Sequence, residues 1–217
     1  DDLSPQVPLI RDALRAIGIP RLGAPGCEAD DVIGTLTERH RGTVAVDVVT
    51  GDRDLLQLVD DAGPVRVLYT GKGGVRDPDI VTQAYLRERY AVHTGEAYLD
   101  MSVLRGDTSD GLPGVKGIGD KTAAQLIETY GSLAGLRAAV AAGDPALRGA
   151  RRANLEAASA YLDVAPTVVR VLRDAAVADL DLALPREVAD PELLEQLGEA
   201  YGVANPVGRV LKALGLD

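Results

Sequence analysis

Three short stretches of the sequence gather carboxylates at close spacing, each beside an expected joint between secondary-structure elements. The first opens a helix with GCEADD, the second follows a β-branched segment with TGDRD, and the third is the loop GDTSD. Each has a plain explanation when taken alone, because acidic residues favour the first turn of a helix and an aspartate after a strand can cap the next helix. The seven carboxylates are Glu28, Asp30, Asp31, Asp52, Asp54, Asp107 and Asp110.

Taken together, these carboxylates predict a metal site. Few basic residues are interleaved with them, so their charges would repel and raise one another's pKa values unless cations neutralised them. A set of oxygen ligands suits hard divalent ions such as Mg²⁺ or Mn²⁺ better than Zn²⁺, which prefers histidine and cysteine. A carboxylate cage that holds two ions about 4 Å apart is the usual apparatus for hydrolysing phosphodiesters. The loop with Asp107 and Asp110 does not have the ligand spacing of an EF-hand.

A glycine-rich turn, LPGVKGIGDKTAAQLI, follows the third acidic loop directly. Its glycines precede an apolar helix, which is the pattern of a helix-hairpin-helix turn, although a helix with a glycine-rich lead-in would look similar. Exposed amides and the helix dipole at such a turn hold phosphate without reading base sequence. The nucleotide-binding pattern GxxxxGK[ST] is not satisfied. The residues expected to contact a nucleic-acid backbone are Lys116, Gly117, Gly119, Lys121 and Thr122.

The elements that must position these residues differ between the two parts of the chain. Residues 1–94 alternate helices with β-branched segments at 43–50 and 65–70, which predicts an α/β layer with a parallel sheet. In this part we expect Ser4 to cap a helix over 5–17 that ends at Gly18, and Asp77 to cap a later helix.

Residues 95–217 predict helices almost exclusively. They are expected near 95–105, 119–130, 132–142, 146–173, 190–202 and 206–214, with Pro166 ending or kinking the long one. The prediction is therefore an α/β nuclease core over 1–94, followed by a helical domain over 95–217 that carries the helix-hairpin-helix.

Composition limits the class of protein. The chain has 217 residues and a net charge of −10, which argues against a protein that coats nucleic acid by bulk electrostatics but not against local phosphate binding. Phe and Trp are absent, so aliphatic side chains must form the core. The longest apolar stretches are too short to cross a bilayer, and no signal peptide opens the chain. A single cysteine fits a reducing compartment, so we expect a cytoplasmic protein with no membrane association.

The three acidic motifs and the glycine turn, in this order, resemble the structure-specific 5′ nucleases: the flap endonucleases and the 5′-nuclease domain of bacterial DNA polymerase I. The resemblance covers roughly residues 5–142, and it implies a PIN-like fold and acidic motifs that supply ligands or outer-shell carboxylates for two or more divalent ions. It also implies a possible K⁺ bound by the backbone carbonyls of Val115 and Ile118, although Gly114 stands where some members have serine. Family members begin with a strand that carries a metal-binding aspartate, followed by another acidic strand and a helical arch. Nothing here matches these parts, so we expect N-terminal sequence to be missing.

The resulting expectation is a monomeric, metal-dependent 5′ flap endonuclease and 5′-3′ exonuclease that acts on flapped, nicked or gapped DNA, including RNA-primed ends, in replication and repair. No side-chain nucleophile is required beyond the metal ligands. Two alternatives stay open: a non-catalytic module that only recognises branched DNA, and a metal-dependent ribonuclease of the PIN type, which would lack the helix-hairpin-helix. The end of the sequence at LKALGLD mildly favours a stand-alone protein over a polymerase-fused domain.

Overall fold

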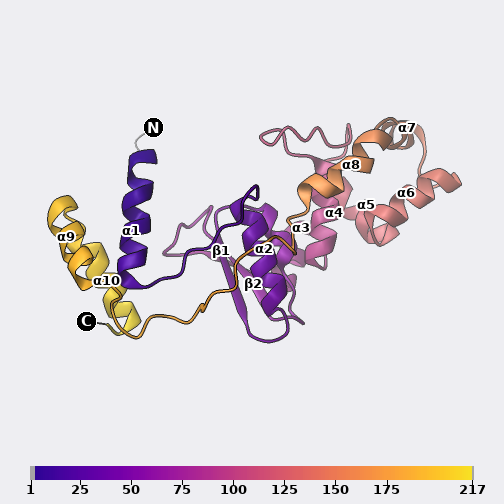
Figure 1. The fold of residues 1–217 in the computed structure, drawn as a ribbon. Coiled ribbons are helices and arrows are strands. Elements are labelled where there is room, and N and C mark those ends of the chain that lie inside the picture. The colour runs from indigo at the N-terminus through magenta and orange to yellow at the C-terminus, as the bar shows by residue number, and fades with distance from the viewer. Residues whose placement is uncertain (1–2, 217) are drawn as a thin grey trace. The chain divides into compact units, whose positions relative to one another are not determined.

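The computed structural model describes residues 3–216, which form two compact units. One unit contains residues 28–175, and the other combines the segment before Glu28 with the segment from Ala176 onward. Both contain helices, but only the first contains a sheet. Figure 1 labels the α-helices of both units and strands β1 and β2.

The larger unit begins with α2 (Ala29–His40), followed by a three-stranded sheet of order β1-β2-β3. Strands β1 (Val46–Thr50) and β2 (Val65–Tyr69) pair in parallel, from Val46 opposite Val65 to Thr50 opposite Tyr69. The 3₁₀ helix η2 (Asp54–Leu58) follows β1 directly, so the carboxyl end of β1 leads into the second acidic motif. This confirms the α/β class and the expected parallel pair.

The third strand, β3 (Asp79–Val81), corrects the expectation of an all-parallel sheet, because it pairs with β2 in the antiparallel direction. It occupies residues that the sequence assigned to a helix beginning at Asp77. That helix is α3 (Gln83–Tyr90), and its N-cap is Thr82, whose hydroxyl accepts a hydrogen bond from the Tyr85 amide. Isoleucine and valine before a threonine cap suit a short strand, so the expected cap lies too early in the chain.

Helices α4 to α8 complete the larger unit. Helix α4 packs against η2, α5 and α8, and α5 packs against α6 (Figure 1). The expected helix over 146–173 is two helices separated at Ala158, and Pro166 lies inside the second one, which continues to Val169. The bounds are α4 Gly95–Arg105, α5 Asp120–Tyr130, α6 Leu133–Ala142, α7 Gly149–Ala157 and α8 Ser159–Val169.

A single aliphatic core unites the sheet with these helices. It extends from Val48 in β1 to Val171 beyond α8, and the largest fully buried side chain in it is Tyr98 of α4. Burial of this many aliphatic groups supplies the main stabilisation of the unit, in the absence of Phe and Trp. The division at residue 94 stays a prediction, since residues on both sides of it pack into this core.

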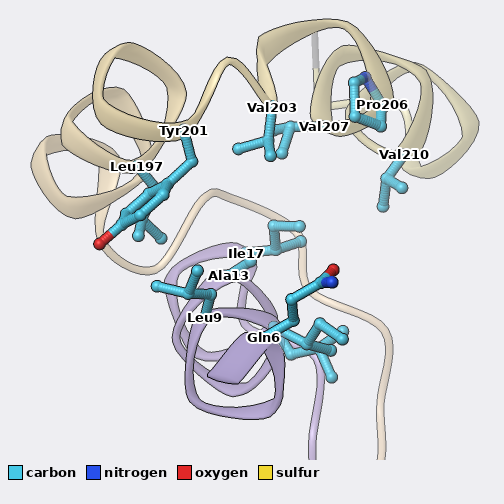
Figure 2. A pocket seen from close by; sticks show the side chains of 12 residues that line it. Gln6, Leu9, Ala13, Ile17, Leu197, Tyr201, Val203, Pro206, Val207 and Val210 are labelled. Carbon is cyan, nitrogen blue, oxygen red and sulfur yellow. The ribbon is translucent and has the colours of Figure 1, made fainter. Parts of the chain in front are cut away.

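The smaller unit consists of η1 (Ser4–Gln6), α1 (Val7–Ile17), α9 (Pro191–Tyr201) and α10 (Ala204–Leu214). Helix α1 ends at Gly18 in the left-handed conformation, as expected, but Ser4 is the first residue of η1 and does not cap a helix. Helix α1 packs beside α9, and an apolar groove of about 480 Å³ lies between α1 and the pair α9–α10 (Figure 2). In residues 3–216 no helix is long and apolar enough to cross a membrane.

Candidate metal centre

The first acidic motif lies at the start of α2, and two of its carboxylates cap that helix. Glu28 is the N-cap residue with extended backbone, and its amide donates a hydrogen bond to Asp31 Oδ2 at 3.2 Å in a capping-box arrangement. Asp31 Oδ1 accepts a second hydrogen bond at 2.9 Å from the amide of Leu172, which follows α8. Both oxygens of Asp31 are therefore engaged within the protein, which favours a positioning role for this residue.

Asp30, between them, has no such partner in the described residues and faces other acids instead. Partial burial raises the pKa of its carboxyl, and the charges of Asp52, Glu28 and Asp31 raise it further. No arginine or lysine lowers it. Asp30 is thus a carboxylate that lacks a neutralising cation among residues 3–216.

The second motif sits where β1 ends and η2 begins. The Asp52 amide donates to Thr50 Oγ1, and Asp52 Oδ1 accepts from the Asp54 amide, both at 2.9 Å. Asp52 therefore does serve the backbone turn, as the capping explanation requires, through one of its two oxygens. Burial raises the pKa of Asp54 to about 6, together with repulsion from Asp52, Asp110 and Asp107, which Arg105 only partly offsets.

The third motif is a closed loop between α4 and the glycine turn. Asp107 and Leu112 exchange two backbone hydrogen bonds, of 2.9 and 2.7 Å, so the loop returns on itself around Asp110. The close crossing at its base requires glycine at two positions, since a Cβ on Gly106 would lie 2.4 Å from the Gly114 amide nitrogen. Hydrogen bonds from the Ser109 hydroxyl and amide lower the pKa of Asp107 and keep it charged.

The fold brings the three motifs near one another through two residues. The charge of Asp52, at the end of β1, raises the pKa of Asp30 at the start of α2. The charges of Asp107 and Asp110, in the loop after α4, raise the pKa of Asp54 in the same way. Within residues 3–216, however, no group of three or more His, Cys, Asp or Glu side chains is already arranged to hold a metal ion. The carboxylates are neighbours without forming a closed cage.

The residues present nevertheless fit divalent ions. Every candidate donor is a carboxylate oxygen, which is the ligand type that Mg²⁺ and Mn²⁺ prefer. The pKa of Asp54 is raised to about 6 by burial and by neighbouring carboxylates, and a bound cation would reduce this repulsion. The charge of Asp52 repels those of both Asp30 and Asp54, whereas the two oxygens of Asp31 accept hydrogen bonds from backbone amides. The seven-residue ligand set of the sequence stays a prediction.

The glycine turn joins α4 to α5 and has the form of a helix-hairpin-helix. Gly117 adopts a positive φ of 75°, and Gly119 is an extended N-cap with no side-chain cap, so the first amides of α5 are not satisfied by a capping side chain. The side chains of Lys116 and Lys121 are exposed. These features agree with backbone-phosphate contacts, which stay a prediction for the five residues named above.

The side chains of Val115 and Ile118 are buried in the core, which fixes the turn. The Val115 carbonyl accepts a hydrogen bond from the Ile118 amide at 3.0 Å, and that of Lys116 accepts one from Asn154 Nδ2 at 2.8 Å. A carbonyl oxygen has two lone pairs, so the Val115 carbonyl can still contact a cation. The K⁺ site stays a prediction.

A segment after α8 holds the first two motifs in place, and this contact was not predicted from the sequence. The amide group of Gln57, which is 3% exposed, donates to the carbonyls of Asp54 and Val169 at 2.9 Å and accepts from the Val171 amide at 3.1 Å. The buried Thr35 hydroxyl accepts a hydrogen bond from the Ala175 amide at 3.0 Å. A buried glutamine and threonine in otherwise apolar surroundings are the signal that could have identified this contact.

Comparison with family models places the chain among nucleases. Residues 1–91 match the 5′-3′ exonuclease N-terminal resolvase-like domain, and residues 93–191 match the 5′-3′ exonuclease C-terminal SAM fold. A 5′-3′ exonuclease of Streptomyces coelicolor is 52% identical over 99% of this chain and 70% of its own length, and one of Mycobacterium tuberculosis is 46% identical over 99% and 69%. DNA polymerase I of Mycobacterium bovis is 46% identical over 71% of this chain but only 17% of its own length.

Solved structures agree at the level of the fold. The catalytic core of Rad2 in complex with DNA substrate aligns with a TM-score of 0.59 at 15% identity, over 97% of this chain and 70% of that one. T5 5′-exonuclease with bound zinc aligns with a TM-score of 0.54 at 18% identity, over 87% of this chain and 59% of that one. With both family models matched in order across residues 1–191 and relatives identical at about half of all positions, the chain belongs to the 5′-3′ exonuclease family.

Proposed function

We propose that this chain is a divalent-metal-dependent 5′ nuclease that cuts DNA at flaps, nicks, gaps and 5′ ends, RNA-primed ends included, during replication and repair. The observation that carries the proposal is the electrostatic coupling of carboxylates from three separate segments: Asp30 with Asp52, and Asp54 with Asp107 and Asp110. Carboxylates that lie together at the carboxyl end of a strand without neutralising side chains favour the binding of cations there.

The chain's own residues divide the work of such a site. Asp30, Asp52, Asp54, Asp107 and Asp110 would hold Mg²⁺ or Mn²⁺, with Glu28 and Asp31 fixing the start of α2 and completing the outer shell. Ions bound there supply an activated water and stabilise the charge that develops on the leaving 3′ oxygen. No side-chain nucleophile is needed.

The glycine turn would hold the same DNA a short distance away. Lys116, Lys121 and Thr122, with the amides of Gly117 and Gly119, would contact backbone phosphates, and the carbonyls of Val115 and Ile118 would bind K⁺. Such contacts carry no sequence information, so the substrate is selected by its structure. We further propose a cytoplasmic monomer.

The test is cleavage of an end-labelled 5′-flap duplex with Mg²⁺ or Mn²⁺ and with a chelator. Metal-dependent products support the proposal, and failure to cut under every metal condition contradicts it. A flap that is bound but not cut would instead favour the second candidate, a module that recognises branched DNA. That candidate is favoured by one observation, namely that residues 3–216 contain no ready group of three metal-binding side chains.

A further inference from the structure

A small cavity of about 280 Å³ lies beside the third acidic loop and contains two arginines. Arg53 and Arg105 line it, together with Thr108 and the carboxylates of Asp107 and Asp120. This is smaller than the roughly 300–1,000 Å³ of pockets for drug-sized ligands, so it suits one small group. In a chain with a net charge of −10, two guanidinium groups in one cavity among acidic loops need an explanation.

The guanidinium group of Arg105 is partly buried and held in place, but only some of its donors have partners. Its side chain is 15% exposed, and its Nε donates to the carbonyl of Gly106 at 3.2 Å. Its only ion pair among the described residues is a long one, 3.4 Å from Nη1 to Asp120 Oδ1, and the Asp120 side chain is 62% exposed. A guanidinium group has five N–H donors, so most of its donor capacity is left for another acceptor.

Arg53 supplies a second, unpaired cation. It lies between the candidate ligands Asp52 and Asp54, and its exposed side chain makes no hydrogen bond or ion pair with any residue of the described range 3–216. An exposed arginine side chain with no partner, lining the same cavity as the partly buried Arg105, is free to contact an anion bound there.

The hydroxyl of Tyr98 is a third polar group in this neighbourhood. Tyr98 is 1% exposed, and its hydroxyl is buried with no hydrogen-bond partner among the described residues. Burial raises the pKa of Tyr98 to about 12, while Arg105 and Arg53 act against that rise. The Arg105 guanidinium group therefore lies close enough to act on the Tyr98 hydroxyl, although the two do not meet the geometry of a hydrogen bond.

We propose that the Arg53–Arg105 cavity binds one phosphate group of the DNA backbone, adjacent to the phosphate that the carboxylate site cuts. The inference rests on the proposed nuclease function and adds to it a second anchor on the substrate, beside the candidate ligand Asp107. Arginine is suited to the task because its planar fork matches two phosphate oxygens at once. The bound phosphate would compete with Asp120 for Arg105, and the long Arg105–Asp120 contact can yield to it.

The test measures binding in chelator, so that it does not depend on cleavage. A series of 5′-flap duplexes is made in which a single phosphate near the junction is replaced by a neutral methylphosphonate, and the affinity of each is measured by fluorescence anisotropy. For the wild-type chain, replacing the one phosphate that the cavity binds is expected to lower the affinity for the duplex by about 5–10-fold. In Arg105→Gln that position becomes insensitive to the replacement, while all other positions keep their effects.

Two further variants separate the cavity from general effects of charge and folding. Arg53→Gln alters an exposed side chain and is expected to reproduce the insensitive position, and each cavity variant is expected to lower the log–log salt slope of binding by about 0.9. Arg66→Gln is the matched control, because Arg66 is an exposed arginine of β2 paired with Asp47, and the same charge is removed. It is expected to change neither the profile nor the slope.

The outcomes are distinct. If both cavity variants keep the wild-type methylphosphonate profile while the wild-type chain still cuts the flap with Mg²⁺ or Mn²⁺, the cavity assignment is wrong and the nuclease proposal stands. If the wild-type chain neither binds nor cuts the flap, both proposals fall. If the insensitive position is found without any cleavage, the cavity assignment stands and the nuclease proposal falls.

Discussion

Helices α2 and α4 both begin with an acidic residue in the first turn, yet the two carboxylates have opposite environments. Asp30 in α2 has its pKa raised by burial and by three neighbouring acids. Burial also acts to raise the pKa of Glu96 in α4, but hydrogen bonds and charges from Arg170 and Arg173 outweigh it and leave the pKa lowered. The helix dipole favours both residues equally, so it cannot explain the difference.

The comparison shows what separates a structural ion pair from a candidate metal ligand. Around Glu96 the chain supplies its own cations, with Arg170 nitrogens at 2.9 and 2.8 Å from the two carboxylate oxygens. Around Asp30 the neighbours are Asp52, Glu28 and Asp31, and the balancing charge must come from outside the chain. The position of an acid in a helix therefore says less about its function than the charges that tertiary structure places beside it.

The largest expected effect comes from removing a carboxylate on the α2 side. Asp30→Asn or Asp52→Asn should lower the rate of flap cleavage by roughly a thousandfold, since a bound ion supplies several kcal/mol of transition-state stabilisation. Flap binding measured in chelator should stay within about twofold of wild type. Asp179→Asn, an exposed aspartate outside the three motifs, is the matched control and should cut normally. Undiminished cleavage by either motif variant would contradict the metal assignment.

The next effect concerns how the acidic motifs are held. Gln57→Leu should lower the free energy of unfolding by about 2–3 kcal/mol, because it leaves the Val169 carbonyl and the Val171 amide without their partner in the protein interior. Urea denaturation measures this loss. Thr129→Ala removes an exposed hydrogen bond within α5 and should cost far less. Equal losses in the two variants would show that the segment after α8 is not a support for the α2 and η2 motifs.

Asp54 allows the charge repulsion itself to be measured. Its folded-state pKa of about 6 lies above the value of an unfolded aspartate, so the ionised side chain destabilises the folded state. In chelator, Asp54→Asn should therefore raise the free energy of unfolding by about 1–2 kcal/mol above pH 6, after allowance for solvent screening, and the gain should fade below pH 4. In saturating Mn²⁺ the wild-type chain should gain more stability than the variant, since the ion binds the folded state. A variant less stable than wild type in chelator at pH 7 would argue against repulsion at this site.

The sequence predicted the acidic motifs, the glycine turn and most helix bounds, because these depend on local chemistry. Gly18, Gly131 and Gly143 each end a helix in the left-handed conformation, which glycine adopts without steric cost. The strand β3 was missed because three residues give too short a pattern, and the first available cap, Asp77, competed with the real one, Thr82.

What the sequence could not predict is the set of contacts between distant segments. The bond from the Leu172 amide to Asp31 spans 141 positions, and no local pattern marks it. Arg105 was not recognised either, because a lone arginine at the end of a helix is usually a favourable partner of the helix dipole. Only the fold shows that Arg105 lines a cavity together with Arg53 and Asp120.

The smallest expected effect concerns Glu96 of α4, whose charge is balanced by arginines of the chain. Because the folded-state pKa of Glu96 is lowered, its stabilisation is fully present above the unfolded pKa of about 4.3 and is lost as the pH falls through the folded value. Glu96→Gln should cost no more than about 1 kcal/mol at pH 7, since the Glu96 and Arg170 side chains are 51% and 42% exposed. The difference from wild type should shrink below pH 4 and at high salt, in chelator and Mn²⁺ alike. The pH dependence is thus opposite in sign to that of Asp54→Asn, and a shared sign would mean that the arginines do not outweigh the burial of Glu96.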